Sequence, residues 1–114
     1  MWDFIFDALE TLFDWIGEIV SIIIDGVISM FTHVVQYFKG LRLRKNRDVP
    51  FIANENSQKF REMLHQAPVK DVGIFEGTYN EDTNEIENYR SLEADSLDPQ
   101  IKNALGNEPL VVLN

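Results

Sequence analysis

Residues 1–38, which read MWDFIFDALETLFDWIGEIVSIIIDGVISMFTHVVQYF, contain six acidic residues and no lysine or arginine. Their polar residues recur every eleven positions, which is about 3.67 residues per turn over three turns and close to the α-helical value. The recurring residues form three interleaved series: Asp3, Asp14, Asp25 and Gln36; Asp7, Glu18 and Ser29; Glu10, Ser21 and Thr32. Because all three series share one helical stripe and apolar side chains fill the rest, the spacing predicts a single amphipathic helix over residues 1–38.

The apolar face of this predicted helix is wider than the stripe of about 100° that a surface helix of a globular protein needs. Residues 19–38 contain one charged residue, Asp25. A stretch of about 20 predominantly apolar residues crosses a bilayer. We therefore expect a single-pass membrane protein in which residues 19–38 span the membrane, with Trp15 and Tyr37 in the two interfacial aromatic belts.

A basic block, KGLRLRKNR over residues 39–47, follows the expected span and contains five basic residues and no acidic one. Such blocks stay on the cytoplasmic side, so we expect the N-terminus outside and the C-terminal domain in the cytoplasm. The expected membrane-interface anchors are Trp15, Tyr37, Lys39, Arg42, Arg44, Lys45 and Arg47, and residues 39–50 form a juxtamembrane linker. The net charge of −9 argues against nucleic acid as a partner.

Residues 51–114 are expected to form a small domain with the element order α-β-β-α-β, which makes the whole chain an α+β protein. The sequence predicts a helix over 57–66, strands over 72–79 and 86–92 around a polar turn, a helix from Asp98 and Pro99 to Gly106, and a strand over 110–113. A domain of this size is marginally stable alone. We therefore expect a homo-oligomer, for which pairing of an edge strand with a neighbouring copy is one route.

Three functions are compatible with these patterns. In the first, several copies surround a polar lumen lined by the acidic stripe, because rings of carboxylates favour cations in a pore. In the second, the chain is a structural or adaptor subunit of a larger envelope or virion complex. In the third, the amphipathic helix lies on a lipid surface.

We expect no enzyme activity, metal or cofactor. The chain has no cysteine, its two histidines are not spaced as zinc ligands, and no nucleotide-binding or hydrolase motif occurs. The acidic turn with Glu81, Asp82 and Glu85 lacks the spacing of a calcium loop. His33 at the edge of the stripe is expected to be hydrogen-bonded, with gating of a lumen as the alternative, and His65 to bond carbonyls at a helix end.

Overall fold

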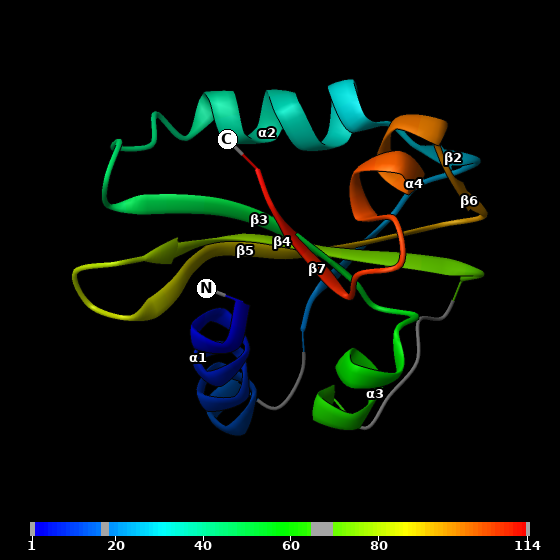
Figure 1. Ribbon diagram of the computed structural model, residues 1–114. Helices are drawn as coiled ribbons and strands as arrows, with labels where there is room; N and C mark the ends of the chain where they lie inside the picture. The colour runs from blue at the N-terminus through cyan, green and yellow to red at the C-terminus, as the bar shows by residue number, and fades with distance from the viewer. Residues whose placement is uncertain (1, 17–18, 65–69, 114) are drawn as a thin grey trace.

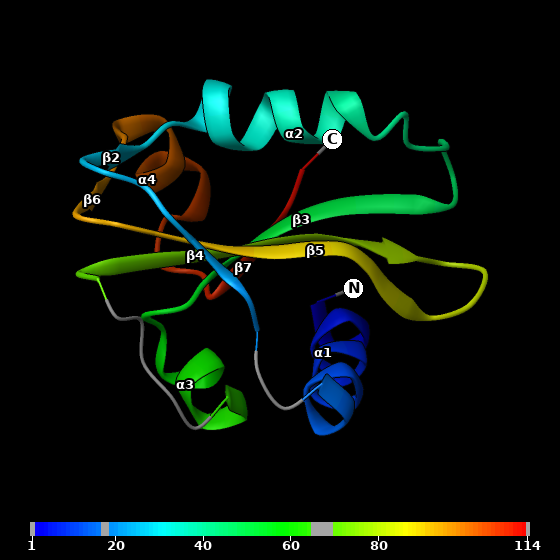
Figure 2. The same ribbon diagram turned by 180° about the vertical axis from the view of Figure 1, so that it is seen from behind.

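The computed structural model describes residues 2–16, 19–64 and 70–113. Within them a five-stranded sheet has the strand order β1-β5-β4-β3-β7. Its strands are β1 (Ser21–Ile23), β3 (Asp48–Asn54), β4 (Val72–Asn80), β5 (Glu85–Ala94) and β7 (Leu110–Val112). Neighbouring strands are antiparallel except β1, which runs parallel to β5. Figure 1 views the sheet from its β7 edge and Figure 2 from its β1 edge.

Helices cover both faces of this sheet (Figure 1). On one face lie α1 (Trp2–Ile16) and α3 (Gln58–Leu64), and on the other lie the π-helix η1 (Met30–Val35), its continuation α2 (Gln36–Gly40) and α4 (Pro99–Leu105). Two short strands, β2 (Val27–Ile28) and β6 (Ser96–Leu97), form a separate parallel pair. The sheet is therefore the middle layer of three.

The hairpin of β4 and β5 is the centre of the sheet. Its turn is closed by Asn80, whose side-chain oxygen accepts the backbone N–H of Asp82 at 2.9 Å, and by Asn84 in the left-handed conformation at φ 58°. The register shifts between Glu76 and Thr78. A Cβ on Gly77 would lie 3.2 Å from the Cβ of Tyr89, so glycine permits the close approach of the two strands at this bulge.

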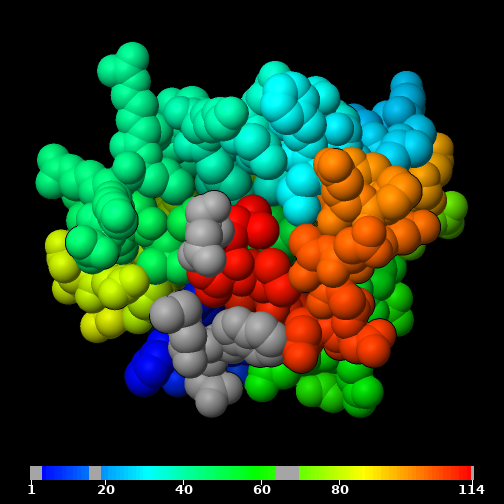
Figure 3. All heavy atoms as spheres, turned by 45° about the horizontal axis from the view of Figure 1, so that its top comes forward, coloured from blue at the N-terminus to red at the C-terminus, as the bar shows by residue number. Residues whose placement is uncertain are grey.

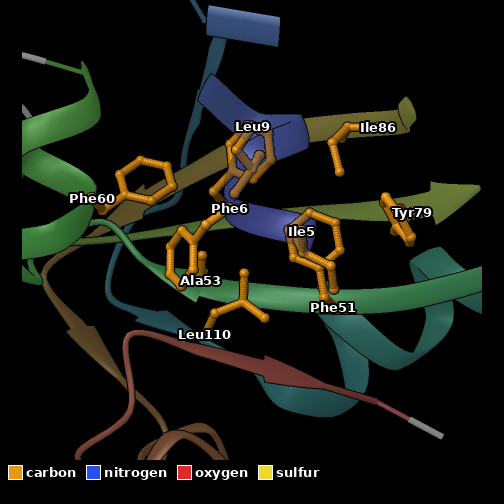
Figure 4. Packing of buried hydrophobic residues seen from close by; sticks show 10 residues of the cluster. Ile5, Phe6, Leu9, Phe51, Ala53, Phe60, Tyr79, Ile86 and Leu110 are labelled. Atoms are coloured by element: carbon orange, nitrogen blue, oxygen red, sulfur yellow. The ribbon is translucent and has the colours of Figure 1, made fainter. Parts of the chain in front are cut away.

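One apolar core lies between the sheet and the layer of α1 and α3 (Figure 4). The apolar positions of α1 recur at helical spacing, and its Ile5 and Leu9 are fully buried. They pack in one cluster with Phe51 of β3, Phe75 of β4 and Phe60 of α3. The apolar face of α1 is thus used to cover the sheet.

A second core lies on the opposite face, beneath η1, α2 and α4. Its fully buried members include Ile28, Val34 and Ile101, which pack against Ile52 and Ile74 of the sheet. In the space-filling view of this side, η1, α2 and α4 lie over the sheet with β7 visible between them (Figure 3). Residues from the first 40 positions therefore contribute to both cores.

The single helix predicted over residues 1–38 is wrong. The helix α1 ends at Ile16, the chain is extended at β1 and β2, and helix resumes only at Met30. The β-branched run Ile22–Ile24 favours strand, and Gly26 adopts φ 92°, which an α-helix does not contain. The eleven-residue period thus describes two separate amphipathic helices with a strand segment between them.

The predicted membrane topology is also wrong. Across the described ranges the longest helix is α1 with 15 residues, and none combines the length and apolar character that a bilayer span needs. The expected single-pass membrane protein, with its N-terminus outside and its C-terminal domain in the cytoplasm, is therefore corrected. The pore and the interfacial belts lose their premise, because both required the spanning helix.

The α+β character predicted for the rest of the chain is confirmed. The predicted order α-β-β-α-β corresponds to α3, β4, β5, α4 and β7, with bounds within two residues where the structure describes them. Asp98 caps α4, since its Oδ1 accepts the N–H of Ile101 at 2.8 Å, and Gly106 has φ 56°. His65 and the predicted end of α3 at Gln66 lie outside the described residues. The prediction missed β3, which begins in the region assigned to the linker and continues into the predicted domain, and the short strand β6.

Candidate functional site

The strand β1 lies at an open edge of the sheet. It pairs on one side with β5, where Ile22 is opposite Leu92 and Ile23 is opposite Glu93. The N–H of Ile24 donates to the carbonyl of Glu93 at 2.8 Å. Because successive backbone groups of a strand point to opposite sides, the N–H and C=O of Ile23 point away from β5, toward the open side. Figure 2 shows β1 in front of β5, with no strand beyond it in the described chain.

This edge is apolar and exposed. We use the name β1 edge for four residues, Val20, Ile22, Ile23 and Val27, whose exposed fractions are 83%, 41%, 51% and 46%. Proteins usually protect an edge strand with lysine, proline, a bulge or a covering element. Residues 19–28 contain neither lysine nor proline, and Asp25 is their only charge. The β1 edge therefore has the properties of a surface that another chain covers.

The contacts that follow β1 hold the edge in place. The carbonyl of Gly26 accepts the N–H groups of Asp95 and Ser96 at 3.0 and 3.1 Å. Asp98 then joins the segment to α4, because its Oδ2 accepts the N–H of Met30 at 2.6 Å while its Oδ1 caps α4. These hydrogen bonds fix the position of the β1 edge relative to the rest of the fold.

A polar cluster lies beneath η1 and α2, on the face of the sheet that these helices cover. The Nε of Arg90 donates to Glu76 Oε2, and its Nη2 donates to the carbonyl of His33 at 2.8 Å. The guanidinium also lies 3.8 Å from the ring centre of Tyr37, whose hydroxyl donates to the carbonyl of Asn88 at 2.6 Å. Arg90 thus ties η1 and α2 to the sheet.

The carboxyl group of Glu76 is fully buried, and its Oε1 has no hydrogen-bond partner among the described residues. Burial raises the pKa of Glu76 to about 7, although Arg90 opposes this shift. The carboxyl group is therefore poised between its neutral and charged forms near neutral pH. Glu76 was not singled out from the sequence, and its position within the largely apolar segment VGIFEGTY is the signal that could have found it.

A second buried carboxyl group lies on the α1 and α3 side of the sheet. Glu55 follows β3, and its Oε2 accepts the hydroxyl of Ser91 on β5. Burial, together with the nearby Glu93, raises the pKa of Glu55 to about 7, against the effect of the Ser91 hydrogen bond. Glu93 is itself buried and accepts the backbone N–H of Lys70 at 3.1 Å. Glu55 and Glu93 were not singled out from the sequence.

Half-open clefts flank α1. One of about 410 Å³ is lined by Phe4, Val49, Tyr79, Glu81 and Asn84. Another of about 290 Å³ lies between α1 and the start of β5, and the exposed Trp15 is part of its wall. In the first cleft the hydroxyl of Tyr79 donates to Asn84 Oδ1 at 2.6 Å, so these two polar groups bind each other.

The polar stripe predicted from the sequence does not form one face. Exposed members on the described residues are Asp7, Glu10, Asp14, Ser21, Asp25, Thr32 and Gln36. Ser29 is half-buried, and its hydroxyl caps η1 by accepting the N–H of Thr32 at 3.1 Å. Glu18 and the side chain of Asp3 lie outside what the structure describes. The acids of α1 and the polar residues of η1 and α2 point to solvent from opposite layers.

The expected interface anchors have separate roles. Side chains of the segment between α2 and β3 project from the surface (Figure 3), and the exposed basic residues are Lys39, Arg42, Arg44 and Lys45. Arg47 pairs with Asp48 at 2.9 Å, and this hydrogen bond holds the pKa of Asp48 below its usual value. Tyr37 is the platform for Arg90, and Trp15 is 85% exposed.

The remaining candidates occupy ordinary structural positions. His33 is hydrogen-bonded as expected, since its Nδ1 accepts the N–H of Ser29 at 2.8 Å. Glu81, Asp82 and Glu85 lie in the exposed turn of the hairpin. Over the described ranges, no three His, Asp or Glu residues are grouped to hold a metal ion.

Comparison with known proteins gave no relative: no family model matches the chain, and neither a curated protein nor a solved structure is significantly similar.

Proposed function

We propose that this chain is a non-catalytic structural subunit that joins another protein chain by adding a strand at the β1 edge. The observation that carries the proposal is an exposed apolar edge strand whose segment contains no lysine or proline and a single charge, Asp25. Strand addition supplies main-chain hydrogen bonds, and apolar side chains supply the specificity. The anchoring of the segment through Gly26 and Asp98 supports the proposal, because a preformed edge loses little conformational freedom on binding.

The backbone of Ile23 allows a direct test. Its N–H points to the open side, so Ile23→Pro removes a donor that strand addition needs and leaves the pairing of Ile22 and Ile24 with β5 intact. Ile23→Val is the matched control, because it keeps both the N–H and a β-branched side chain.

The probe is a fluorescent peptide of alternating valine and threonine with two lysines at each end, chosen to complement the charge of −9. In fluorescence anisotropy, wild type and Ile23→Val should bind this peptide, and Ile23→Pro should bind at least about tenfold more weakly. Circular dichroism shows whether each variant is folded. Equal binding by a folded Ile23→Pro variant, or no binding by any protein, would overturn the proposal.

A further inference from the structure

We infer that the strand added at the β1 edge is β1 of a second copy of this chain, paired antiparallel about a two-fold axis at Ile23. This inference rests on the proposed strand addition and specifies its partner. A two-fold axis perpendicular to the sheet makes one continuous ten-stranded sheet from two five-stranded ones. It also keeps α1 and α3 of both copies on one face, so the layers of the two copies continue one another.

The register about Ile23 pairs apolar residues with apolar residues and a polar residue with a polar one. Ile23 opposes Ile23 of the other copy, and their outward N–H and C=O groups exchange hydrogen bonds. Ile22 then opposes Ile24, which places two apolar side chains together on the η1 side. Ser21 lies opposite Asp25, which follows β1 at a bend, so a hydroxyl donor comes near the only carboxylate of residues 19–28.

Neighbouring registers are less favourable. An axis at Ile22 would place the carboxylate of Asp25 opposite the apolar Ile19, which packs against the α1 core. An axis at Ser21 would place Ile23 opposite Ile19, and Asp25 would lie beyond the described residues that can pair. Of these three registers, the pairing about Ile23 is the one that places Ser21 opposite Asp25 and isoleucine opposite isoleucine over residues 22–24.

Charge and area set the strength of this dimer. Each copy has a net charge of −9, so the two repel at long range, and added salt strengthens the dimer by screening that repulsion. A basic peptide at the same edge would show the opposite salt dependence. An interface confined to one edge is near or below about 1,200 Å² in total, so we expect micromolar affinity.

Residue 23 at the axis gives a charge-swap experiment. Its side chain is half-exposed, so both Ile23→Lys and Ile23→Glu are compatible with the fold. In either variant two like charges face each other across the axis, and light scattering should give the mass of one copy, 13.2 kDa. Wild type and Ile23→Val should approach twice that mass with rising concentration and salt. An equimolar mixture of the Lys and Glu variants should recover the double mass.

Every other result contradicts the inference. If both variants still form dimers, the copies pair elsewhere. If the folded variants are single copies and their mixture does not recover the double mass, Ile23 does not face itself. Alternatively, wild type is a single copy at all concentrations and still binds the peptide, while Ile23→Pro does not bind it. That result would contradict the dimer and support strand addition by a different chain. If the peptide does not bind either, both proposals fall.

Discussion

At the scale of single residues, the pair of Arg90 and Glu76 places ionisable groups in an otherwise largely apolar interior. Arg90 links a fully buried carboxyl group to the carbonyl of His33 and the ring of Tyr37. Removing one member of a buried pair leaves the other without compensation, whereas replacing both with apolar residues is often tolerated. Comparing single and double variants therefore shows whether the two side chains stabilise the fold through their interaction or only by filling space.

Arg90→Leu should lower the free energy of unfolding by about 3 kcal/mol, because Glu76 and the carbonyl of His33 lose their donor. The double variant Arg90→Leu with Glu76→Leu should regain most of this loss. Urea unfolding at neutral pH measures both, and Arg61→Leu on the exposed side of α3 is the control. A double variant that is less stable than Arg90→Leu would contradict the pairing.

Glu55 predicts how stability depends on pH. Its folded-state pKa is raised from 4.5 to about 7, so folding favours the protonated carboxyl group. The resulting stabilisation is complete below the unfolded pKa and is lost as the pH rises through the folded pKa. Glu76 is shifted in the same direction and adds to the effect.

The urea midpoint of the wild type should therefore fall as the pH is raised from about 5 to about 8. In Glu55→Gln the fall should be smaller, by up to about 3 kcal/mol in free energy. Glu85→Gln, in the exposed turn, should behave as the wild type. An unchanged pH dependence in Glu55→Gln would show that Glu55 is not protonated on folding.

At the scale of elements, α1 shows how the packing uses an amphipathic helix. Leu9 is fully buried against the sheet, while Glu10 is exposed. Leu9→Ala should cost about 2–5 kcal/mol of unfolding free energy, because a cavity opens beside Phe60 and Phe75. Glu10→Ala should change it by less than about 0.5 kcal/mol. Equal stability of the two variants would show that α1 does not cover the sheet.

The elements that could be predicted carry local signals. The helix α4 has Asp98, Pro99 and Gly106 at its ends, and β4 and β5 flank a polar turn. The strand β3 carries no such signal, because its pairing with β4 and β7 depends on residues far along the chain.

The first 38 residues misled because helical periodicity persists across the two helices that flank β1. A short apolar run such as Ile22–Ile24 fits either a buried helix or a strand by periodicity alone. The partners of that run, Leu92 and Glu93, lie about 70 residues away, and no local pattern announces them.

The polar cluster was not predicted from the sequence. The single acid inside the strand segment VGIFEGTY is the signal that could have indicated Glu76. Its pairing with Arg90 depends on the register of the hairpin next to the bulge at Gly77, which alternation alone does not fix.

At the scale of the whole molecule, the chain is a three-layer α+β domain in which the segment 19–28 forms one margin of the sheet. The two cores are covered by helices. At the β1 edge the sheet ends on exposed apolar side chains, whereas the residues of β7 at the opposite edge are buried or half-buried. An exposed apolar edge of this kind is a template for pairing with another chain. The proposed assembly rests on this observation.

Residue-resolved amide hydrogen exchange at several protein concentrations shows whether β1 is hydrogen-bonded on one side and open on the other. The amide of Ile24, bonded to Glu93, should be protected at every concentration, and that of Ile23 should exchange fast in dilute protein and slow as the concentration rises. Fast exchange of Ile24, or equal protection of both amides at all dilutions, would contradict a β1 strand with one side bonded and the other open.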